Sequence, residues 1–441
     1  MDSKREGKPE FMPYDILCAM KKKRRLRKKF RIFLWLLALL AMAFFALYAY
    51  LLKIQMPDEM VAASMQVTEE NSVDESHENI AEEAQEEVIE APSSYYYDQL
   101  DEQEKDVYSY LLSQFEIYQS DISVNYVSYE TFRSAETALY MDHPEFYWIR
   151  DLHTYYRNVF EEITRVEYPM ENAESYLAQC DAEAQAVIAG IPEGSTSYQT
   201  VKYLYESIIN STSYDLEAIM AGTVSDDQDI RSVLLNHRSV CAGYATTFKY
   251  LCDQVGIDCI VSTGTARSGG MEENHAWNAV KLNGQWYWVD VTWGEQEFEN
   301  GGMETINYNY LCVPDFMMSD SHIADASLGL ADEGIDKTFM LPACTDENME
   351  YYHLLGAYFE TYDEGAFRSY YLEAYKENPD SVISVRFGSD EEMQKCIQDM
   401  ITGQKIFDLL YTFNPLKSYY QVSYGQSVSA HVLDILITDS H

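Results

Sequence analysis

The sequence predicts an α+β protein, and three patterns along the chain support that fold class. Apolar residues recur at helical spacing through much of residues 98–210. Between residues 239 and 293 one helical pattern is followed by two strand-like runs that an Asn-Gly dipeptide joins. In residues 340–441 helical and strand patterns alternate again, which predicts a small α+β C-terminal domain. A chain of 441 residues has room for two or three such folded units.

The charge of the chain is divided between two regions. Residues 1–53 carry 13 basic and 4 acidic residues, a net charge of +9, whereas residues 54–441 carry 18 basic and 69 acidic residues, a net charge of -51. So acidic a region repels phosphate backbones, and we expect no nucleic-acid partner. The sequence contains no P-loop and no GxGxxG, HExxH or C-x-x-C motif, so we expect no nucleotide, metal or cofactor.

Residues 32–52 form an uncharged apolar run that predicts a transmembrane helix. At about 1.5 Å per residue the run reaches about 30 Å, one hydrocarbon core. Nine basic residues lie just before the run, and only Lys53 follows it directly. The positive-inside rule then places residues 1–31 in the cytoplasm as a basic tail and the rest outside the cell membrane, in a single-pass type II topology. A cleaved signal peptide is the alternative, but the run is longer than the usual roughly 7–15 residues and lacks a small-residue cleavage site.

Residues 53–97 are predicted to be an acidic disordered stalk. Positions 54–97 contain 12 acidic residues and neither Lys nor Arg. Like charges repel, and few apolar side chains are available for burial. The stalk would set how far the folded part reaches from the membrane.

Residues 98–197 are predicted to be a mostly helical region. Helical periodicity is present over residues 98–118, 143–163 and 173–191. We expect the many aromatic side chains of these segments to pack a core rather than to bind a ligand.

Cys241 begins a helical pattern that ends at Gly256. A cysteine at a helix N-terminus meets unpaired N–H groups and the positive end of the helix dipole, and both favour the nucleophilic thiolate. The small residue Gly243 lets a substrate approach closely, and backbone N–H groups there are placed to stabilise an oxyanion. Taken alone, a buried structural cysteine or half of a disulfide is the simpler interpretation.

A β-hairpin is predicted where Asn-Gly separates the runs HAWNAVKL and QWYWVDVTW. In a two-residue turn Leu282 faces Gln285, and Trp277 faces Asp290. Side chains two positions apart share a face, so His275, Trp277 and Asp290 project from the same side. His275 and Asp290 are then diagonal neighbours about 7–8 Å apart at the backbone, a gap that their side chains can bridge. An aspartate bonded to one imidazole nitrogen orients the ring and leaves the other nitrogen for a nucleophile.

Each of these three residues has an ordinary structural interpretation by itself. His275 fits a core histidine, and Asp290 fits a cap at the end of a strand. A helix-starting cysteine and a His–Asp pair within 50 residues nevertheless favour a joint catalytic site. The sequence therefore predicts Cys241 as nucleophile, His275 as base and Asp290 as the residue that orients the base.

Two segments, VCAGYATTFKYLCDQVGI and NHAWNAVKLNGQWYWVDVTW, resemble the core of the transglutaminase-like superfamily. Secreted or membrane-anchored bacterial members are the most similar. The order Cys, His, Asp and the spacings of 34 and 15 residues fit that group. Upstream, SIINSTSYD, DQDIRSVLLNHRSVCAGY and the lead-in DHPEFYW are also similar. The likeness runs roughly from Gln199 to His322.

The resemblance implies a transglutaminase-like domain over residues 198–325 with a papain-like core, in which a nucleophile helix packs on an antiparallel sheet. It assigns the same three roles to Cys241, His275 and Asp290. No side-chain oxyanion donor can be placed. The candidates to line the cleft are Tyr214, Gly243, Trp277 and Trp293. The chain departs from the family pattern after VDVTW, where Gly-Glu-Gln stands in place of an Asp-Pro turn, so the edge of the site is expected to differ.

Seven cysteines lie beyond the predicted membrane helix, and six remain if Cys241 is a free nucleophile. The six are Cys180, Cys252, Cys259, Cys312, Cys344 and Cys396. They allow up to three disulfides, and buried free thiols are equally compatible with the sequence.

Two further residue groups have a functional and a structural interpretation. Asp226, Asp227 and Asp229 match no EF-hand loop, and we expect them to begin a helix rather than to bind calcium. The 37 tyrosines suit a sugar-stacking surface, but packing is the commoner use.

Together these patterns predict a membrane-anchored extracytoplasmic Cys–His–Asp acyl-transfer enzyme acting on peptide or glutamine-type amides. Hydrolysis is favoured over amine cross-linking because water needs no second binding site. The expected partners are protein or peptide substrates, cell-wall peptides among them, and the acidic outer part favours cationic or neutral ones. The alternative is a catalytically silent transglutaminase-like binding or assembly module at the cell surface.

Overall fold

The computed structural model describes residues 94–151, 153–223, 228–268, 271–297, 304–319, 321–379, 381–413, 420–427 and 430–438. The predicted basic tail, the predicted transmembrane helix over 32–52 and residues 53–93 of the predicted stalk lie outside these ranges. Among the described residues, no helix combines the length and the apolar composition that a bilayer crossing requires.

The last residues of the predicted stalk are part of the folded body, which corrects the boundary at residue 97. Tyr96 is fully buried, and its hydroxyl donates a hydrogen bond to the carbonyl oxygen of Val261 at 2.5 Å. Its backbone N–H donates to Asp142 at 3.0 Å. Three consecutive tyrosines, Tyr95, Tyr96 and Tyr97, supply apolar surface for this packing.

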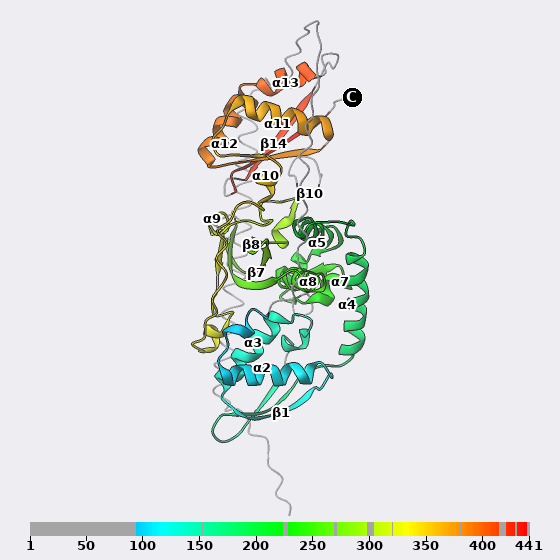
Figure 1. The fold of residues 1–441 in the computed structure, drawn as a ribbon, viewed down its shortest axis with the longest axis vertical. Coiled ribbons are helices and arrows are strands. Elements are labelled where there is room, and N and C mark those ends of the chain that lie inside the picture. Colours follow the sequence, from blue (N-terminus) through cyan, green and yellow to red (C-terminus); the bar gives the residue numbers. More distant parts are fainter. Residues whose placement is uncertain are drawn as a thin grey trace, which may run out of the picture. The chain divides into compact units, whose positions relative to one another are not determined.

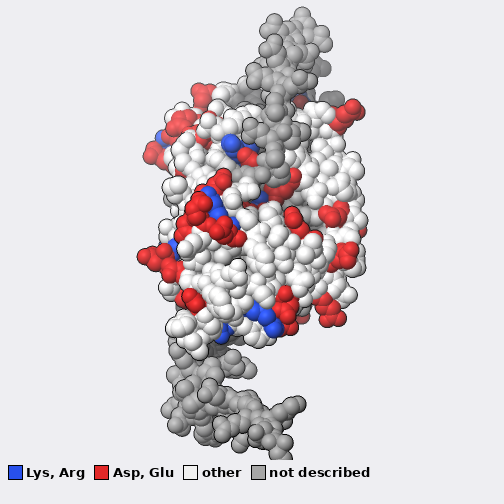
Figure 2. Space-filling view, turned by 60° about the horizontal axis from the view of Figure 1, so that its bottom comes forward, with Lys and Arg blue, Asp and Glu red and all other residues white. Residues whose placement is uncertain are grey.

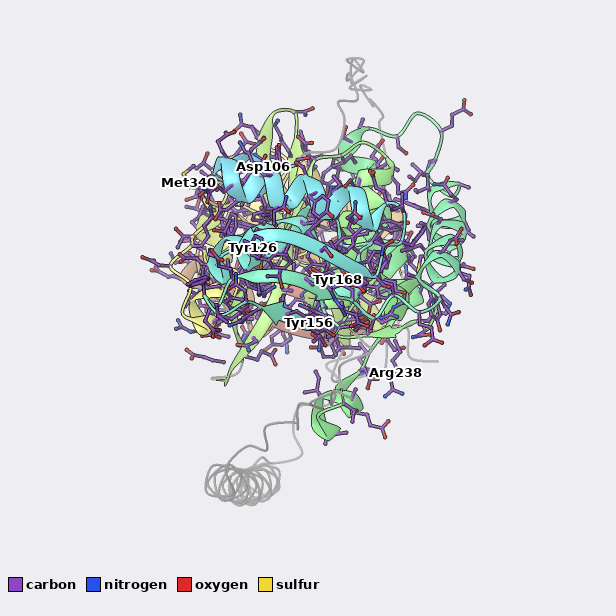
Figure 3. The ribbon with its side chains drawn as sticks, turned by 90° about the horizontal axis from the view of Figure 1, so that it is seen from below. Asp106, Tyr126, Tyr156, Tyr168, Arg238 and Met340 are labelled. Atoms are coloured by element: carbon purple, nitrogen blue, oxygen red, sulfur yellow. The ribbon has the colours of Figure 1, made fainter. Side chains whose placement is uncertain are left out.

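The N-terminal region contains a sheet as well as helices. Its elements are the short 3-10 helix η1 (Tyr97–Gln99), α2 (Glu102–Phe115), β1 (Asp121–Val127), α3 (Tyr129–Asp142), η2 (Tyr147–Ile149), β2 (Thr154–Arg157), β3 (Ile163–Glu167) and α4 (Ala173–Ile188). The strands form an antiparallel sheet in the order β1-β3-β2. Figure 3 looks onto this part, where Asp106 labels α2 and Tyr126 and Tyr156 label the outer strands.

The helix predicted over residues 143–163 is therefore wrong. The segment holds one 3-10 turn and strand β2, and it ends where β3 begins. Tyr155 and Tyr156 are residues that favour a pleated strand over a helix. Buried residues of β3, Ile163 and Val166, pack into the main core, so tertiary contacts outweighed the apparent helical period.

The central part places a nucleophile-bearing helix on an antiparallel sheet. Its elements are α5 (Ser197–Ser211), β4 (Ser213–Tyr214), α6 (Leu216–Ala221), α7 (Ile230–Leu234), β5 (Arg238–Ser239), α8 (Cys241–Gln254), β6 (Cys259–Ser268), β7 (Met271–Leu282), β8 (Gln285–Val289), η4 (Thr292–Gly294), β9 (Glu295–Glu297), β10 (Glu304–Ile306), α9 (Asp315–Met318), β11 (His322–Ala324) and η5 (Leu330–Glu333). The main sheet has the order β11-β6-β7-β8. Helix α8 packs on β6 and β7, as Figure 1 shows.

One hydrophobic core joins the N-terminal region to the central part. It extends from Tyr96 to Cys344 and includes Phe115 of α2, Phe248 of α8 and Val280 of β7. The two regions that the sequence separates at residue 197 therefore fold around shared apolar surface. This shared core brings the N-terminal region next to the candidate site.

The C-terminal part is the predicted small α+β unit. Its elements are α10 (Tyr351–Leu354), β12 (Tyr358–Phe359), α11 (Glu364–Glu377), β13 (Val382–Phe387), α12 (Asp390–Cys396), the π-helical turn η6 (Ile397–Thr402), α13 (Lys405–Phe413), β14 (Gln421–Ser427) and β15 (Val432–Thr438). The sheet order is β12-β13-β15-β14, and α11 and α12 pack on β13. Strand β13 coincides with the predicted run VISVRF. The C-terminal unit has a hydrophobic core of its own around Phe367, Val385 and Leu410.

A buried arginine connects the C-terminal sheet to the central part. Arg386 on β13 is 2% exposed and forms an ion pair with Glu350 at 2.6 Å. It also donates to the carbonyl oxygens of Asn309 and Ala430, both at 3.0 Å. These charge-assisted bonds satisfy a guanidinium that would otherwise be costly to bury.

Candidate active site

Cys241 is the first residue of α8, as predicted. It is half-buried, and the preceding residue Val240 provides no side-chain cap for the helix. Cys241 therefore lies at the N-terminal end of α8, where the helix dipole attracts negative charge. Cys241 lines a pocket of about 1100 Å³.

The hairpin that carries His275 has the predicted register. Asn283 and Gly284 adopt positive φ angles of 50° and 77°, as a two-residue type I′ turn requires. Leu282 pairs with Gln285, and the ladder continues to Asn278 opposite Val289. Asp290 then follows the last residue of β8.

His275 and Asp290 are in direct contact. The ring Nε2 of His275 lies 2.7 Å from Oδ2 of Asp290. Both side chains are buried, at 1% and 0% exposed. The other carboxylate oxygen, Oδ1, accepts a hydrogen bond from the backbone N–H of Trp293 at 3.1 Å. The His–Asp pair that the hairpin register predicts is therefore formed, and its carboxylate is held by backbone as well as by side chains.

The second ring nitrogen of His275 has no partner in the described part of the chain. Nδ1 is buried and makes no hydrogen bond there. Cys241 lines the same pocket as His275, and its thiol is close enough to contribute to the raised pKa of His275. A buried nitrogen left without a partner costs free energy, so it is an acceptor or donor held ready for another group.

Electrostatics in the pair favour a charged imidazolium. Burial lowers the pKa of His275, but the charge and hydrogen bond of Asp290, with a contribution from Cys241, outweigh it and raise the pKa to about 10. Burial likewise raises the pKa of Asp290, but its contacts with His275 and His322 hold it well below the usual range. The site is therefore suited to an imidazolium at His275 beside the ionised carboxylate of Asp290.

A second histidine, His322 on β11, also bonds Asp290. Its Nε2 lies 2.9 Å from the same oxygen, Oδ2, and its side chain is fully buried. Strand β11 pairs with β6, which puts His322 opposite Ala266. Sequence reasoning missed this residue because it lies 32 positions from Asp290 on a strand of three residues, and no local periodicity places it.

Of the four predicted cleft residues, only Tyr214 lines the pocket. The prediction for Gly243 is wrong, because a Cβ there would lie 2.0 Å from the Ser239 hydroxyl and 2.6 Å from that of Ser232, inside the fold. Trp277 is 1% exposed and stacks beside His275 with ring centroids 6.0 Å apart.

Trp293 is likewise outside the pocket lining. Its ring packs against His275 and His322 at centroid distances of 5.6 and 4.5 Å. Both tryptophan rings therefore pack against histidine rings of the site, where their large apolar surface restricts movement of the imidazoles.

Tyr214 lies close to the nucleophile. Burial raises the pKa of its hydroxyl, the nearby Cys241 thiol adds to this rise, and the backbone N–H of Cys241 partly opposes it. The hydroxyl is thus next to both the thiol and the first N–H of α8.

The pocket is lined by three parts of the chain. One wall comes from the N-terminal region with Arg133 and Tyr155, one from the elements around Cys241, and one from the turn with Asp325 and Glu333. Acidic lining residues outnumber the basic ones. The wider surface has the same bias, since Figure 2 shows acidic side chains scattered over the visible face with Lys and Arg at few places.

Among the described residues, one group of three side chains is arranged closely enough to hold a metal ion: His275, Asp290 and His322. One ligand atom from each lies within 4.8 Å of the others. Two imidazoles and a carboxylate suit a divalent transition metal. Both Nε2 atoms, however, lie at hydrogen-bond distance from the same oxygen, which fits two N–H donors on one carboxylate without a cation.

Other sequence expectations are also decided in the described part. All seven of its cysteines are free thiols, so the alternative of up to three disulfides is wrong there. Six of them are buried, and Cys241 is the more accessible one. Asp229 caps the N-terminus of α7 by accepting from the backbone N–H of Arg231, as predicted, whereas Asp226 and Asp227 lie outside the described residues.

Comparison with known proteins identifies the domain that contains this site. Residues 185–291 match the Transglutaminase-like superfamily. The chain therefore contains a transglutaminase-like domain, with the papain-like α+β arrangement of a helix on an antiparallel sheet. The match ends one residue after Asp290, so His322 lies beyond it.

Individual relatives match the same part of the chain. Kyphoscoliosis peptidase of Homo sapiens is 31% identical over 137 residues, which are 28% of this chain and 20% of the relative. Its counterpart in Mus musculus is 32% identical over 114 residues, 24% of this chain and 17% of the relative. A solved structure described as a TGase is 18% identical, with a TM-score of 0.25, over 33% of this chain and 43% of that one. The chain thus spans a fifth or less of the length of the two peptidases.

Proposed function

We propose that the pocket is the active site of a Cys–His–Asp enzyme that cleaves peptide or glutamine-type amides through a thioester. One observation carries the proposal: His275, whose buried ring is held at Nε2 by Asp290 and has no partner at Nδ1 in the described part of the chain, lines the same pocket as half-buried Cys241. A cysteine and an oriented base in this order form an activated nucleophile. The match to the Transglutaminase-like superfamily supports the same chemistry.

In the first step the Cys241 thiolate attacks the amide carbonyl carbon. A C–S bond forms, and the carbonyl π electrons move onto oxygen. We assign the stabilisation of this oxyanion to the N-terminal end of α8 and to the Tyr214 hydroxyl, which interacts with Cys241. The His275 imidazolium then gives its Nδ1 proton to the departing amine, the C–N bond breaks, and a thioester remains.

In the second step an acceptor resolves the thioester. Neutral His275 removes a proton from water, the new C–O bond forms, and the C–S bond breaks to release an acid and the thiolate. An amine acceptor would give a new amide instead. We favour water because a second binding site is not needed, and because the mammalian relatives are named peptidases.

The substrates that suit the pocket are cationic or neutral peptides. Glu273 and Asp332 line it, and the folded outer part carries a large excess of acidic residues. Opposite charge raises the local concentration of a substrate and speeds its encounter with the cleft. Cell-wall peptides are one source of such substrates if the chain is exposed outside the cell.

We also propose that the enzyme is anchored in the cell membrane by residues 32–52, with the catalytic domain outside. This rests on the length of the apolar run and on the basic residues before it. Cysteine accessibility tests it in intact cells, because a membrane-impermeant maleimide added outside would label Cys241 and spare Cys18. Labelling of Cys18 alone would reverse the proposed topology.

The catalytic proposal is tested by alkylation and turnover of the purified full chain in detergent. Near neutral pH, iodoacetamide should modify Cys241 at least about 10-fold faster than it does in His275→Gln, because the variant cannot form the thiolate–imidazolium pair. The six buried thiols serve as internal controls in peptide mass spectrometry. Equal rates in the two proteins would refute the proposal and leave a silent binding module.

A peptide library incubated in ¹⁸O water, with and without a primary amine, then separates the two reactions. Incorporation of ¹⁸O into a new carboxylate marks hydrolysis, whereas mass gain by the amine marks transamidation. Cys241→Ala should abolish both products.

A further inference from the structure

Asp290 is shared by two histidines from strands of the main sheet that are separated by β6. His275 lies on β7, and His322 lies on the edge strand β11. Their Nε2 atoms approach the same oxygen, Oδ2, at 2.7 and 2.9 Å. A carboxylate oxygen has room for two such donors, so both contacts are satisfied at once.

The proton on Nε2 of His322 is set by Asp290, because a carboxylate oxygen can only accept a hydrogen bond. On the other side of the ring, the Ser321 hydroxyl lies 2.8 Å from Nδ1 of His322. The same hydroxyl donates to the carbonyl oxygen of Met318 at 3.3 Å. His322 is therefore in polar contact through both ring nitrogens, and it donates to Asp290 through Nε2.

Aromatic rings also pack around His322. Its ring contacts Trp293, Trp277 and Tyr310 at centroid distances of 4.5, 5.0 and 5.5 Å. The side chain is fully buried and does not line the pocket. It therefore has no route to a substrate, and any effect on the reaction must pass through Asp290.

We propose that His322 is a positioning residue that locks the Asp290 carboxylate in the orientation that His275 requires; this rests on the proposed function. Trp293 N–H holds Oδ1, and His322 holds Oδ2, so the carboxylate cannot rotate about its Cβ–Cγ bond. Without the second donor on Oδ2, the carboxylate turns away from the line to His275. The imidazole then loses the orientation that aims Nδ1 at Cys241.

This role predicts a specific kinetic pattern. His322→Leu should lower kcat by about 10- to 100-fold, the range expected when a hydrogen bond to a buried charge is lost, and should leave KM within about 3-fold of the wild type. His322→Gln should recover most of kcat, because its side-chain amide can donate to Oδ2 but cannot titrate. His143→Leu, a histidine outside the pocket lining, serves as the matched control.

The pH profile of Cys241 alkylation provides a readout that needs no substrate. In His322→Leu the midpoint should move to higher pH, because a misaligned His275 stabilises the thiolate less. His322→Gln should move it back. A folded His322→Leu protein with wild-type kcat and midpoint would overturn the proposal, as would a His322→Gln protein as impaired as the leucine variant.

Two further experiments distinguish failure of the His322 proposal from misfolding of a variant and from failure of the proposed function. If His322→Leu does not fold, Ser321→Ala decides: it removes the polar contact at Nδ1 that helps to fix the His322 ring, and an unchanged kcat and midpoint would then overturn the proposal. If instead wild-type Cys241 reacts no faster than it does in His275→Gln, the proposed function itself fails. That result is independent of any His322 variant.

Discussion

The side-chain amide of Asn278 on β7 donates a hydrogen bond to the carbonyl oxygen of Ala245 on α8 at 2.9 Å. The same amide donates to Ile260 on β6 at 3.1 Å, and the residue is fully buried. Asn278 is three residues from His275, and Ala245 is four residues from Cys241. The contact therefore ties the helix of the thiol to the strand of the imidazole.

Replacing Asn278 should loosen this connection. Asn278→Leu removes two buried hydrogen bonds, each worth about 0.5–1.5 kcal/mol, so the free energy of unfolding should fall by about 1–3 kcal/mol. Urea unfolding of the full chain measures the change. Asn274→Leu, an exposed residue on the same strand, is the control and should change stability by less than about 0.5 kcal/mol. Similar losses in both variants would contradict the assignment.

Asp290→Asn should remove nearly all activity while the fold survives. The amide N–H of asparagine faces an imidazole nitrogen that now must accept, which moves the ring proton of His275 to Nδ1 and blocks transfer from the thiol. A loss of about 10³–10⁴-fold in kcat is expected for such a tautomer error. Circular dichroism and turnover of the variant check it. A loss below about 10-fold would mean that Asp290 does not orient the base.

The pKa of His275 predicts a pH dependence of stability. Its value of about 10 lies above the ordinary value of 6.5, so the imidazolium stabilises the folded state. That contribution is complete below about pH 6.5 and is lost as the pH rises through about 10. The Tm difference between wild type and His275→Gln should therefore narrow between about pH 7 and pH 10.5, and kcat/KM should fall over the same alkaline limb. A constant Tm difference would show that His275 is neutral in the fold.

Gly243→Ala should destabilise the start of α8. The added methyl group would meet the Ser239 and Ser232 hydroxyls at 2.0 and 2.6 Å, and these two hydroxyls are themselves hydrogen-bonded. Overpacking of this kind costs about 1–3 kcal/mol. Gly365→Ala in α11 is the matched control, because its new methyl group would meet only Asp363 at 3.3 Å. Thermal unfolding should separate the two variants, and equal Tm values would contradict the predicted clash.

Tyr214→Phe tests the oxyanion donor. Loss of a hydroxyl beside the first N–H of α8 should lower kcat by about 100-fold and leave the alkylation of Cys241 by iodoacetamide within about 3-fold. Tyr140→Phe, in the N-terminal wall of the same pocket, should leave kcat within about 2-fold. If both variants behave alike, the Tyr214 hydroxyl has no special role in the transition state.

Local patterns in the sequence were sufficient to predict the local geometry of the site. The Asn-Gly turn determines the hairpin register, because only φ-permissive residues form a two-residue turn, and the register brings His275 to Asp290. The position of Cys241 at the start of a helix follows from the apolar period and the Gly256 stop. The C-terminal strand over 382–387 is equally local. Each of these features depends on residues within about 15 positions of one another along the chain.

Only the tertiary structure decided what depends on distant residues. Strand β2 replaced a predicted helix because β3 and the core stabilise it, and Tyr96 joined the fold through contacts 46 and 165 positions away. The side of Gly243 on which a Cβ would stand faces the Ser239 and Ser232 hydroxyls in the interior, because packing between elements places them there. His322 meets Asp290 through the edge of a sheet that no sequence period encodes. Sequence periodicity reports which face a side chain occupies within its own element, whereas packing between elements determines what that face meets.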